Sequence, residues 1–197
     1  PSEAILYPEG REQLTRVNVP GISAELCGRS RPDFFSGVAT VVTKLFNVVQ
    51  PNYAVFGQKD FQQWLVICQL VRDLNVPIEM VLGQTVRESD GLAMSSRNQY
   101  LSPTDRQLAR QLSATLFSLK ERVINNDNAR ELCRVAALAS QEANAFLASS
   151  GFKVDYVTVR NKKTLSLPCE LDSTNDLIAL GAVWLGNTRL IDNVLFS

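Results

Sequence analysis

The sequence predicts an α/β fold in two parts, half of a parallel α/β unit over residues 1–83 and a small α+β domain over residues 84–197. In the first part, segments with helical spacing alternate with short apolar runs, which is the element order of a parallel sheet. In the second part, two long amphipathic segments precede runs that are typical of strands. A polar, glycine-containing stretch separates the two patterns and is expected to form a long functional loop.

The first expected helix follows Ser36 and ends before Pro51. Apolar residues recur along it at spacings of three and four residues, which predicts one buried face. These residues are Val38, Val41, Val42, Leu45 and Val49. Ser36 is expected to be the N-cap, and Pro51 disfavours helical backbone in the residue before it. The next run, residues 53–56, is almost continuously apolar, which suits a parallel strand covered on both faces.

A second helix is expected from about Asp60 to Asn75, with Leu65 and Cys68 on its inner side. Residues 77–83 are again rich in apolar side chains and predict the next strand. The order of helix, strand, helix and strand is the order found around a parallel sheet, where helices connect neighbouring strands.

The second part opens with a well-marked helix start. Ser102 is expected as the N-cap, Pro103 as the first helical residue, and Asp105 as the acidic residue of the first turn. The second amphipathic segment, residues 128–150, is expected to stop at Gly151, because glycine readily adopts the left-handed backbone that ends helices.

The last segments predict strands. Residues 153–161 alternate between apolar and polar side chains, and residues 176–196 are expected to form two strands around a turn at Gly186–Asn187. The two tryptophans, Trp64 and Trp184, are expected to be core residues because buried aromatic side chains are more common than aromatic ligand platforms.

Charge and residue usage exclude several functions. Basic and acidic residues both number 20, so no net positive field attracts nucleic acid or a membrane surface. No apolar run is long enough to span a membrane, and no signal-peptide pattern is present, so we expect a cytoplasmic protein. The four widely spaced cysteines are expected to be reduced and mostly buried. The sequence contains no histidine, which excludes Ser-His-Asp and Cys-His catalysis within it.

The segment from Gly57 to Asp60 has the pattern of a phosphate site. It follows a strand, and in open α/β sheets ligands bind at the carboxyl ends of strands. Gly57 lets the backbone approach a ligand, Lys59 adds a positive charge, and the N–H groups of a helix start favour phosphate. Asp60 is expected either to cap the helix or to accept ribose hydroxyls. A plain turn with an exposed lysine and a capping aspartate explains the same residues, and the segment alone does not decide between the two.

The residues Ser95, Ser96, Arg97 and Asn98 bring several donors and a permanent positive charge into the long loop, which suits a polyphosphate. Taken alone, they also fit a solvated turn before the next helix. Taken together with Lys59 at a strand end, they predict that a triphosphate is held from two sides.

Two further pairs of residues are weaker candidates. Arg29 and Arg31 could contact an anionic substrate, although a simple lead into the following helix is the favoured interpretation. Gln62 and Gln63 lie in the first turn of a helix, where one could bind a hydroxyl or carboxylate and both could equally lie on the surface.

Three longer segments resemble the pantothenate synthetase (pantoate–β-alanine ligase, AMP-forming) family. They are residues 29–63, 85–102 and 184–193. Their most specific parts are the Gly-x-Lys-Asp-aromatic-Gln-Gln segment and the Met-Ser-Ser-Arg-Asn loop, which is similar to the Lys-Met-Ser-Lys-Ser loop of class I aminoacyl-tRNA synthetases. The resemblance implies that residues 1–83 are the C-terminal half of a Rossmann-like ATP- and pantoate-binding nucleotidyltransferase domain. Residues 84–197 would then be a small C-terminal lid domain.

The resemblance also implies a reaction. ATP would activate pantoate as pantoyl adenylate with release of pyrophosphate, and β-alanine would then attack to give pantothenate and AMP. The expected ATP-binding residues are Gly57, Gln58, Lys59, Asp60, Val86, Met94, Ser95, Ser96 and Arg97. The residues expected to stabilise phosphate charge in catalysis are Lys59, Ser95, Ser96 and Arg97.

Other roles follow from the same resemblance. Gly57 and Asp60 would contact the ribose, and Val86 would contact the adenine side through its backbone. Gln63 would hydrogen-bond pantoate. Magnesium carried on the ATP phosphates would be the metal, with no protein metal site, and the complete enzyme would be a homodimer.

The sequence departs from the family pattern in several places. The family begins with a strand and a His-x-Gly-His loop, which this histidine-free sequence lacks, so the first half of the sheet is expected to be missing and activity to be poor. Phe34 stands where the family has histidine, and Gln84 where it has proline. Two alternatives therefore stay open. One is a catalytically silent nucleotide-binding or oligomerising fragment, and the other is an adenylate-forming transferase for another acid, against which the retained Gln63 argues.

Overall fold

The structure is a computed structural model that describes residues 1–10, 14–126 and 131–196. The chain divides into two compact units, Pro1–Gly83 and Gln84–Ser197. The elements of the first unit are α1 (Glu3–Leu6), α2 (Cys27–Ser30), α3 (Phe34–Val49), β1 (Tyr53–Gly57), α4 (Phe61–Asp73) and β2 (Glu79–Gly83). The elements of the second unit are α5 (Pro103–Ile124), α6 (Leu132–Ser149), β3 (Lys153–Asn161), β4 (Leu177–Leu185) and β5 (Thr188–Leu195).

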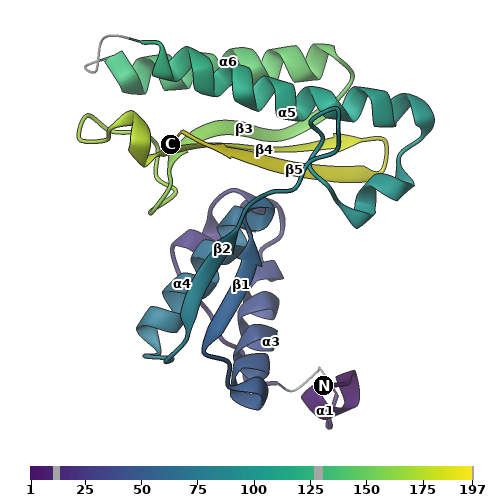
Figure 1. The fold of residues 1–197 in the computed structure, drawn as a ribbon, viewed down its shortest axis with the longest axis vertical. Coiled ribbons are helices and arrows are strands. Elements are labelled where there is room, and N and C mark those ends of the chain that lie inside the picture. Colours follow the sequence, from purple (N-terminus) through teal and green to yellow (C-terminus); the bar gives the residue numbers. More distant parts are fainter. Residues whose placement is uncertain (11–13, 127–130, 197) are drawn as a thin grey trace. The chain divides into compact units, whose positions relative to one another are not determined.

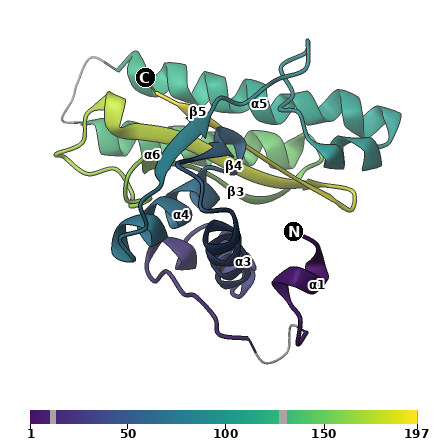
Figure 2. The same ribbon diagram turned by 60° about the horizontal axis from the view of Figure 1, so that its bottom comes forward.

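The first unit is built on a parallel pair of strands (Figure 1). β1 pairs with β2 from Tyr53 opposite Glu79 to Gly57 opposite Gly83, which confirms the predicted parallel sheet. α3 and α4 pack against each other, and Figure 2 views α3 nearly along its axis beside α4. Their shared apolar core includes Phe35, Ala39, Val42, Phe46, Ala54, Val66, Ile67 and Leu70.

The buried face of α3 differs from the predicted one. The helix begins at Phe34 with Asp33 at the N-cap position, so Ser36 lies inside the helix, where its Oγ donates to the Val17 carbonyl at 3.4 Å. The buried apolar residues are Phe35, Ala39, Val42 and Phe46. Val49, which was expected to be buried, is 58% exposed. The prediction is confirmed for Val42, while Val38 and Val41 are only partly buried against the same core. It was wrong for Val49, because Phe35 and Phe46 follow the same spacing one position away and fill the interior.

β1 is covered on one face only by the described residues. Ala54 is buried, whereas Tyr53 and Val55 are 63% and 68% exposed. The expectation that this strand is covered on both faces was therefore wrong, because α3 and α4 both pack on the Ala54 side. In α4, Leu65 is buried as expected, and Cys68 is half-buried.

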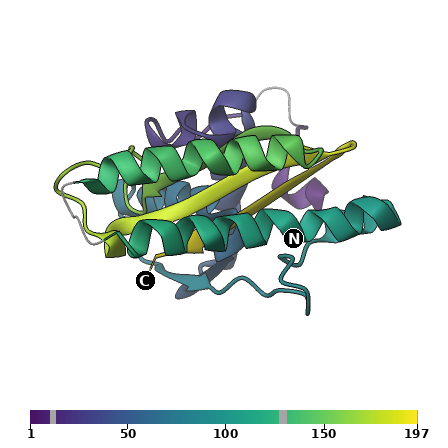
Figure 3. The same cartoon turned by 90° about the horizontal axis from the view of Figure 1, so that it is seen from above.

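The second unit is an antiparallel sheet with the strand order β3-β4-β5. α5 and α6 lie side by side over one face of the sheet (Figure 3). The predicted turn between β4 and β5 is confirmed, with Gly186 at a φ of 55°. The core between sheet and helices includes Leu112, Leu116, Leu119, Ala139, Leu147, Ala179 and Val183.

Both helices of this unit begin and end largely as the sequence predicts. The Ser102 hydroxyl accepts a hydrogen bond from the Asp105 amide at 3.1 Å and donates to its carboxylate at 2.8 Å, which confirms the N-cap. α6 ends at Ser149, and Gly151 has a φ of 96°. Residues 128–130 of the second expected helix lie outside the described residues.

Two expectations about buried side chains were wrong. Trp184 is 37% exposed, because it lies near the end of β4 beside the turn. The four cysteines are free, but Cys169 is exposed and the other three are only half-buried. No helix within the described ranges combines the length and the apolar character that crossing a bilayer requires.

Candidate active site

The turn after β1 leaves open space at the end of a strand. Gly57 ends the strand, and the 3-10 turn Gln58–Asp60 leads directly into α4. Gly57 has an ordinary φ of −70°, and a Cβ added there would have no described atom within 4 Å beyond its chain neighbours. Neither backbone conformation nor packing within the described chain requires glycine here. The space lies at the carboxyl end of a parallel strand, where ligands bind in open α/β sheets.

Lys59 and Asp60 occupy this turn. Lys59 is half-buried and Asp60 is exposed. Asp60 stands at the N-cap position of α4, yet its carboxylate makes no capping hydrogen bond to the described backbone. The first N–H groups of an α-helix have no partner within the helix, so this helix start can favour an anion.

The adjacent glutamines have different environments. Gln62 is buried, and its Nε2 donates to the carbonyls of Ile22 at 2.9 Å and Glu25 at 2.6 Å. Its Oε1 accepts from the Cys27 amide at 3.1 Å. Gln62 therefore ties the segment before α3 to α4, a role that sequence reasoning missed because its partners are backbone groups far away along the chain. Gln63 takes no part in this network and is half-buried.

The long loop of the second unit is a structured turn. Arg87 lies opposite Ala93 in an antiparallel bridge, and the Met94 amide donates to the Val86 carbonyl at 2.9 Å. The Glu88 amide donates to the Leu92 carbonyl at 2.8 Å. Two short chain segments therefore run side by side before the Ser-Ser-Arg sequence begins.

The side chains after this turn differ in how they are used. The Ser95 hydroxyl accepts from the Arg97 amide at 3.2 Å and starts the 3-10 turn Ser96–Tyr100. Ser96 and Arg97 are exposed, and the Arg97 guanidinium forms no ion pair with any residue in the described ranges. Val86 and Met94 are 66% and 50% exposed. An unpaired cation thus lies in the same loop as exposed apolar side chains, which suits a nucleotide with phosphates and a flat base.

The arginines before α3 have partners within the chain. Arg29 forms an ion pair with Glu25 at 2.8 Å. The guanidinium carbon of Arg31 lies 3.7 Å from the centre of the Phe34 ring, a cation–π contact. Both contacts favour the interpretation that these arginines lead into the helix.

The expected site residues form two sets. Gly57, Gln58, Lys59, Asp60 and Gln63 belong to the first unit, and Val86, Met94, Ser95, Ser96 and Arg97 belong to the second. The first set lies between the end of β1 and the first turn of α4, and the second set lies on the loop that contains residues 86–97. The approach of the two sets to a common ligand stays a prediction.

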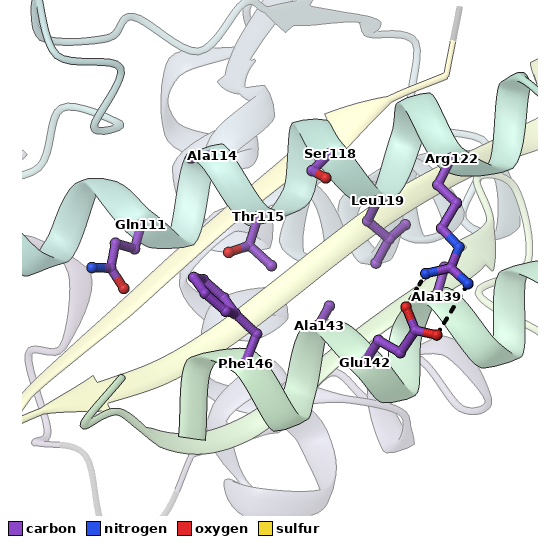
Figure 4. A pocket seen from close by; sticks show the side chains of 10 residues that line it. All are labelled: Gln111, Ala114, Thr115, Ser118, Leu119, Arg122, Ala139, Glu142, Ala143 and Phe146. Atoms are coloured by element: carbon purple, nitrogen blue, oxygen red, sulfur yellow. Dashed lines mark hydrogen bonds and ion pairs between the residues drawn. The ribbon is translucent and has the colours of Figure 1, made fainter. Parts of the chain in front are cut away.

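Two hollows of the surface lie apart from these residues. One, of about 380 Å³, lies between α5 and α6 and is lined by five apolar and five polar side chains, with the Arg122–Glu142 ion pair at one end (Figure 4). The other, of about 580 Å³, lies beside α3 and is lined by Phe34, Val38 and Val41 among others. None of the expected ATP-binding residues lines either hollow.

Comparison with known families decides what kind of chain this is. The sequence model described as pantoate-beta-alanine ligase matches residues 1–195. The chain belongs to the pantoate-beta-alanine ligase family. Members of this family make pantothenate from pantoate and beta-alanine with ATP, so the resemblance found in the sequence is confirmed.

Individual members of the family are similar over the whole chain. The chain is 49% identical over 199 residues to the pantothenate synthetase of Shewanella amazonensis, covering 100% of this chain and 67% of that protein. A pantothenate synthetase structure from Thermus thermophilus matches with a TM-score of 0.86 and 42% identity, covering 100% of this chain and 68% of the other. This chain thus spans about two thirds of the length of these relatives.

A third relative is a ligand complex. The pantoate-beta-alanine ligase of Francisella tularensis, complexed with beta-gamma ATP and beta-alanine, matches with a TM-score of 0.73 and 31% identity, covering 100% of this chain and 63% of that chain. These structures confirm the α/β fold with a nucleotidyltransferase domain and a small C-terminal domain.

Proposed function

We propose that this chain carries the ATP-binding turn and the phosphate-binding loop of a pantoate–β-alanine ligase that acts through a pantoyl adenylate. The observation that supports this most directly is the open space at Gly57, followed at once by Lys59 and the start of α4. Residues 1–83 act as the C-terminal half of the ATP- and pantoate-binding domain, and residues 84–197 act as the lid. The enzyme works in the cytoplasm, and its complete form is a homodimer.

The chemistry proceeds in two displacements. A carboxylate oxygen of pantoate attacks the α-phosphorus of ATP, the bond to the β-phosphate oxygen breaks, and pyrophosphate leaves. The amine of β-alanine then attacks the acyl carbon, loses a proton as the amide forms, and displaces AMP.

The residues act by position and charge. Lys59, Ser95, Ser96 and Arg97 bind the phosphates and stabilise the negative charge that develops there. Gln63 hydrogen-bonds pantoate, while Gly57 and Asp60 contact the ribose. Gln58, Val86 and Met94 complete the nucleotide site.

A magnesium ion fits this site when it arrives bound to ATP. The described residues contain no group of three or more His, Cys, Asp or Glu side chains that could hold a metal. Magnesium retains waters and binds largely through substrate phosphates, so it needs few protein carboxylates. Asp60 is the only carboxylate between Gly57 and Gln63 that could approach it. When bound, the ion would neutralise phosphate charge.

Calorimetric titration with Mg-ATP tests the site. We expect saturable binding that Lys59→Ala and Arg97→Ala each weaken about tenfold or more, because each removes a charge-assisted contact. Gly57→Ala should also weaken binding while leaving the thermal unfolding midpoint unchanged, since its Cβ fills only the open space. Arg134→Ala, which removes an exposed arginine of α6, is the matched control.

The outcomes separate the rival functions. Wild-type affinity in both Lys59→Ala and Arg97→Ala would remove the assignment of the ATP site. Mg-ATP binding without AMP release in the presence of pantoate and β-alanine would instead favour a nucleotide-binding module without ligase activity of its own.

A further inference from the structure

Arg87 uses both terminal nitrogens of its guanidinium group inside the second unit. Its Nη1 donates to Asp192 Oδ2 at 2.7 Å and its Nη2 donates to Asp192 Oδ1 at 3.1 Å. Nη1 also donates to the Gly91 carbonyl at 3.1 Å and to the Ser113 hydroxyl at 3.0 Å. Nη2 reaches the Asn193 carbonyl at 3.3 Å. The planar fork of arginine suits this two-pronged contact, which lysine cannot reproduce.

This ion pair differs from those on the protein surface. The Asp192 side chain is 2% exposed and that of Arg87 is 20% exposed. Removing one partner of such a pair leaves an uncompensated charge in the interior, whereas exposed pairs contribute little. Asp192 is further fixed because its Oδ1 accepts from the Asn193 amide at 2.8 Å. Arg87 is therefore anchored to β5.

The anchored residue is also the base of the Ser-Ser-Arg loop. Arg87 bonds to the carbonyl of Gly91 across the turn and lies opposite Ala93, two residues before Ser95. A second tie, between Arg106 of α5 and Asp90 at 2.6 and 3.2 Å, fixes the tip of the turn.

The loop thus has a fixed base and an exposed working end. Arg87 directs its hydrogen bonds to the fold, whereas the Arg97 guanidinium forms no ion pair with any residue of the described chain. Binding costs less when donors are held in place before the ligand arrives.

We propose that Arg87 is a positioning residue, which through its fork on Asp192 holds the loop in the shape that presents Ser95, Ser96 and Arg97 to phosphate. The inference rests on the proposed function of those three residues. Arg87 itself touches no substrate and acts through the loop.

Arg87→Lys, which keeps the charge and loses the fork, tests this in the full chain. We expect the dissociation constant for Mg-ATP to rise about threefold to 30-fold, the range for residues that act through a network. Hydrogen exchange should become faster for the amides of residues 93–100 and stay unchanged for those of β4. Arg189→Lys is the matched control, because Arg189 pairs with Asp155 of β3 at 2.6 Å, so both readouts should stay unchanged.

The double variant Arg87→Lys/Arg97→Ala distinguishes this inference from the proposed function. If Arg87 acts through the loop, Arg87→Lys weakens Mg-ATP binding less in the Arg97→Ala protein than in the wild-type protein. A loss of affinity in Arg97→Ala with none in Arg87→Lys overturns the positioning role and leaves the ATP site standing. No loss in Arg97→Ala removes the phosphate role of the loop on which this inference rests, and the ATP assignment as a whole falls only if Lys59→Ala also keeps wild-type affinity.

Faster exchange throughout the second unit in Arg87→Lys would mean that the pair only stabilises the fold, and would also overturn the inference. Should Arg87→Lys fail to fold, Ser113→Ala removes a single acceptor of Nη1. Ser113→Ala should raise the dissociation constant for Mg-ATP and speed hydrogen exchange of the loop amides, both by less than Arg87→Lys would. If affinity and loop exchange are both unchanged in this variant, the positioning role is contradicted.

Discussion

Neighbouring residues of the same type have different roles, one bonded within the fold and the other proposed to contact a ligand. Gln62 is fully engaged by three hydrogen bonds to the backbone, while its neighbour Gln63 stays outside that network. Arg87 and Arg97 show the same division ten positions apart. Such pairs look equivalent in the sequence because residue type alone does not say which side chain has partners. Gln63 and Arg97, which take no part in these networks, are the members of each pair proposed to contact a ligand.

The carboxyl group of Asp90 provides a test with pH. Hydrogen bonds from the Arg106 guanidinium hold the pKa of Asp90 below its ordinary value. Because the folded state favours the ionised form, the tie at the tip of the loop is fully present above the ordinary pKa of aspartate and is lost as pH falls through the lowered one. We expect the NMR titration of Asp90 to have a lower midpoint than in the unfolded chain.

Arg106→Gln should move that midpoint upward. Asp176 is the control within the same spectrum, because Ser173 lowers its pKa and Arg106 takes no part. Equal titration midpoints of Asp90 in the wild-type protein and the Arg106→Gln variant would contradict the role given to Arg106.

Among the elements, α6 protects the free edge of a sheet. β3 is an edge strand of the second unit, and unpaired strand edges tend to recruit other chains. The Asn144 side chain of α6 donates to the Val157 carbonyl at 2.7 Å and accepts from the Val157 amide at 3.1 Å. Ser140 accepts from the Val159 amide at 3.2 Å. Two polar side chains of one helix thus take the place of a neighbouring strand.

Asn144→Ala should destabilise the second unit by about 1–3 kcal/mol, because it leaves the amide and carbonyl of Val157 without these partners. Urea denaturation followed by circular dichroism measures the change. Glu142→Ala on the same helix removes only an exposed ion pair with Arg122 and should cost less than about 1 kcal/mol. An effect of Asn144→Ala no larger than that of Glu142→Ala would count against edge protection by α6.

For the whole molecule, the two units differ in how completely their sheets are covered. The second unit encloses a core between its helices and its antiparallel sheet, whereas Tyr53 and Val55 of the first unit are exposed. Local opening is easier where fewer apolar contacts are buried. We expect limited proteolysis to leave a resistant fragment beginning near Gln84 while residues 1–83 are degraded first. Equal resistance of both units in a dilute monomer would refute this difference.

The sequence by itself determined the order of elements, most helix ends and the family. These depend on local signals, such as the Ser102 cap, Gly151 after α6 and Gly186 in the last turn, and on motifs of adjacent residues. Most of the candidate ATP residues could likewise be named from the motifs, because they stand next to one another in two short segments, residues 57–60 and 94–97.

Only the tertiary structure decided which side chains those elements bury. The apolar residues of α3 fit two neighbouring faces, and the choice depended on packing with α4. β1 is covered on one face only, because α3 and α4 both pack against the face that carries Ala54. The pairing of Arg87 with Asp192 joins residues 105 positions apart. No local pattern specifies such a contact, because it forms only when the folded backbone brings the two side chains together and excludes water from them.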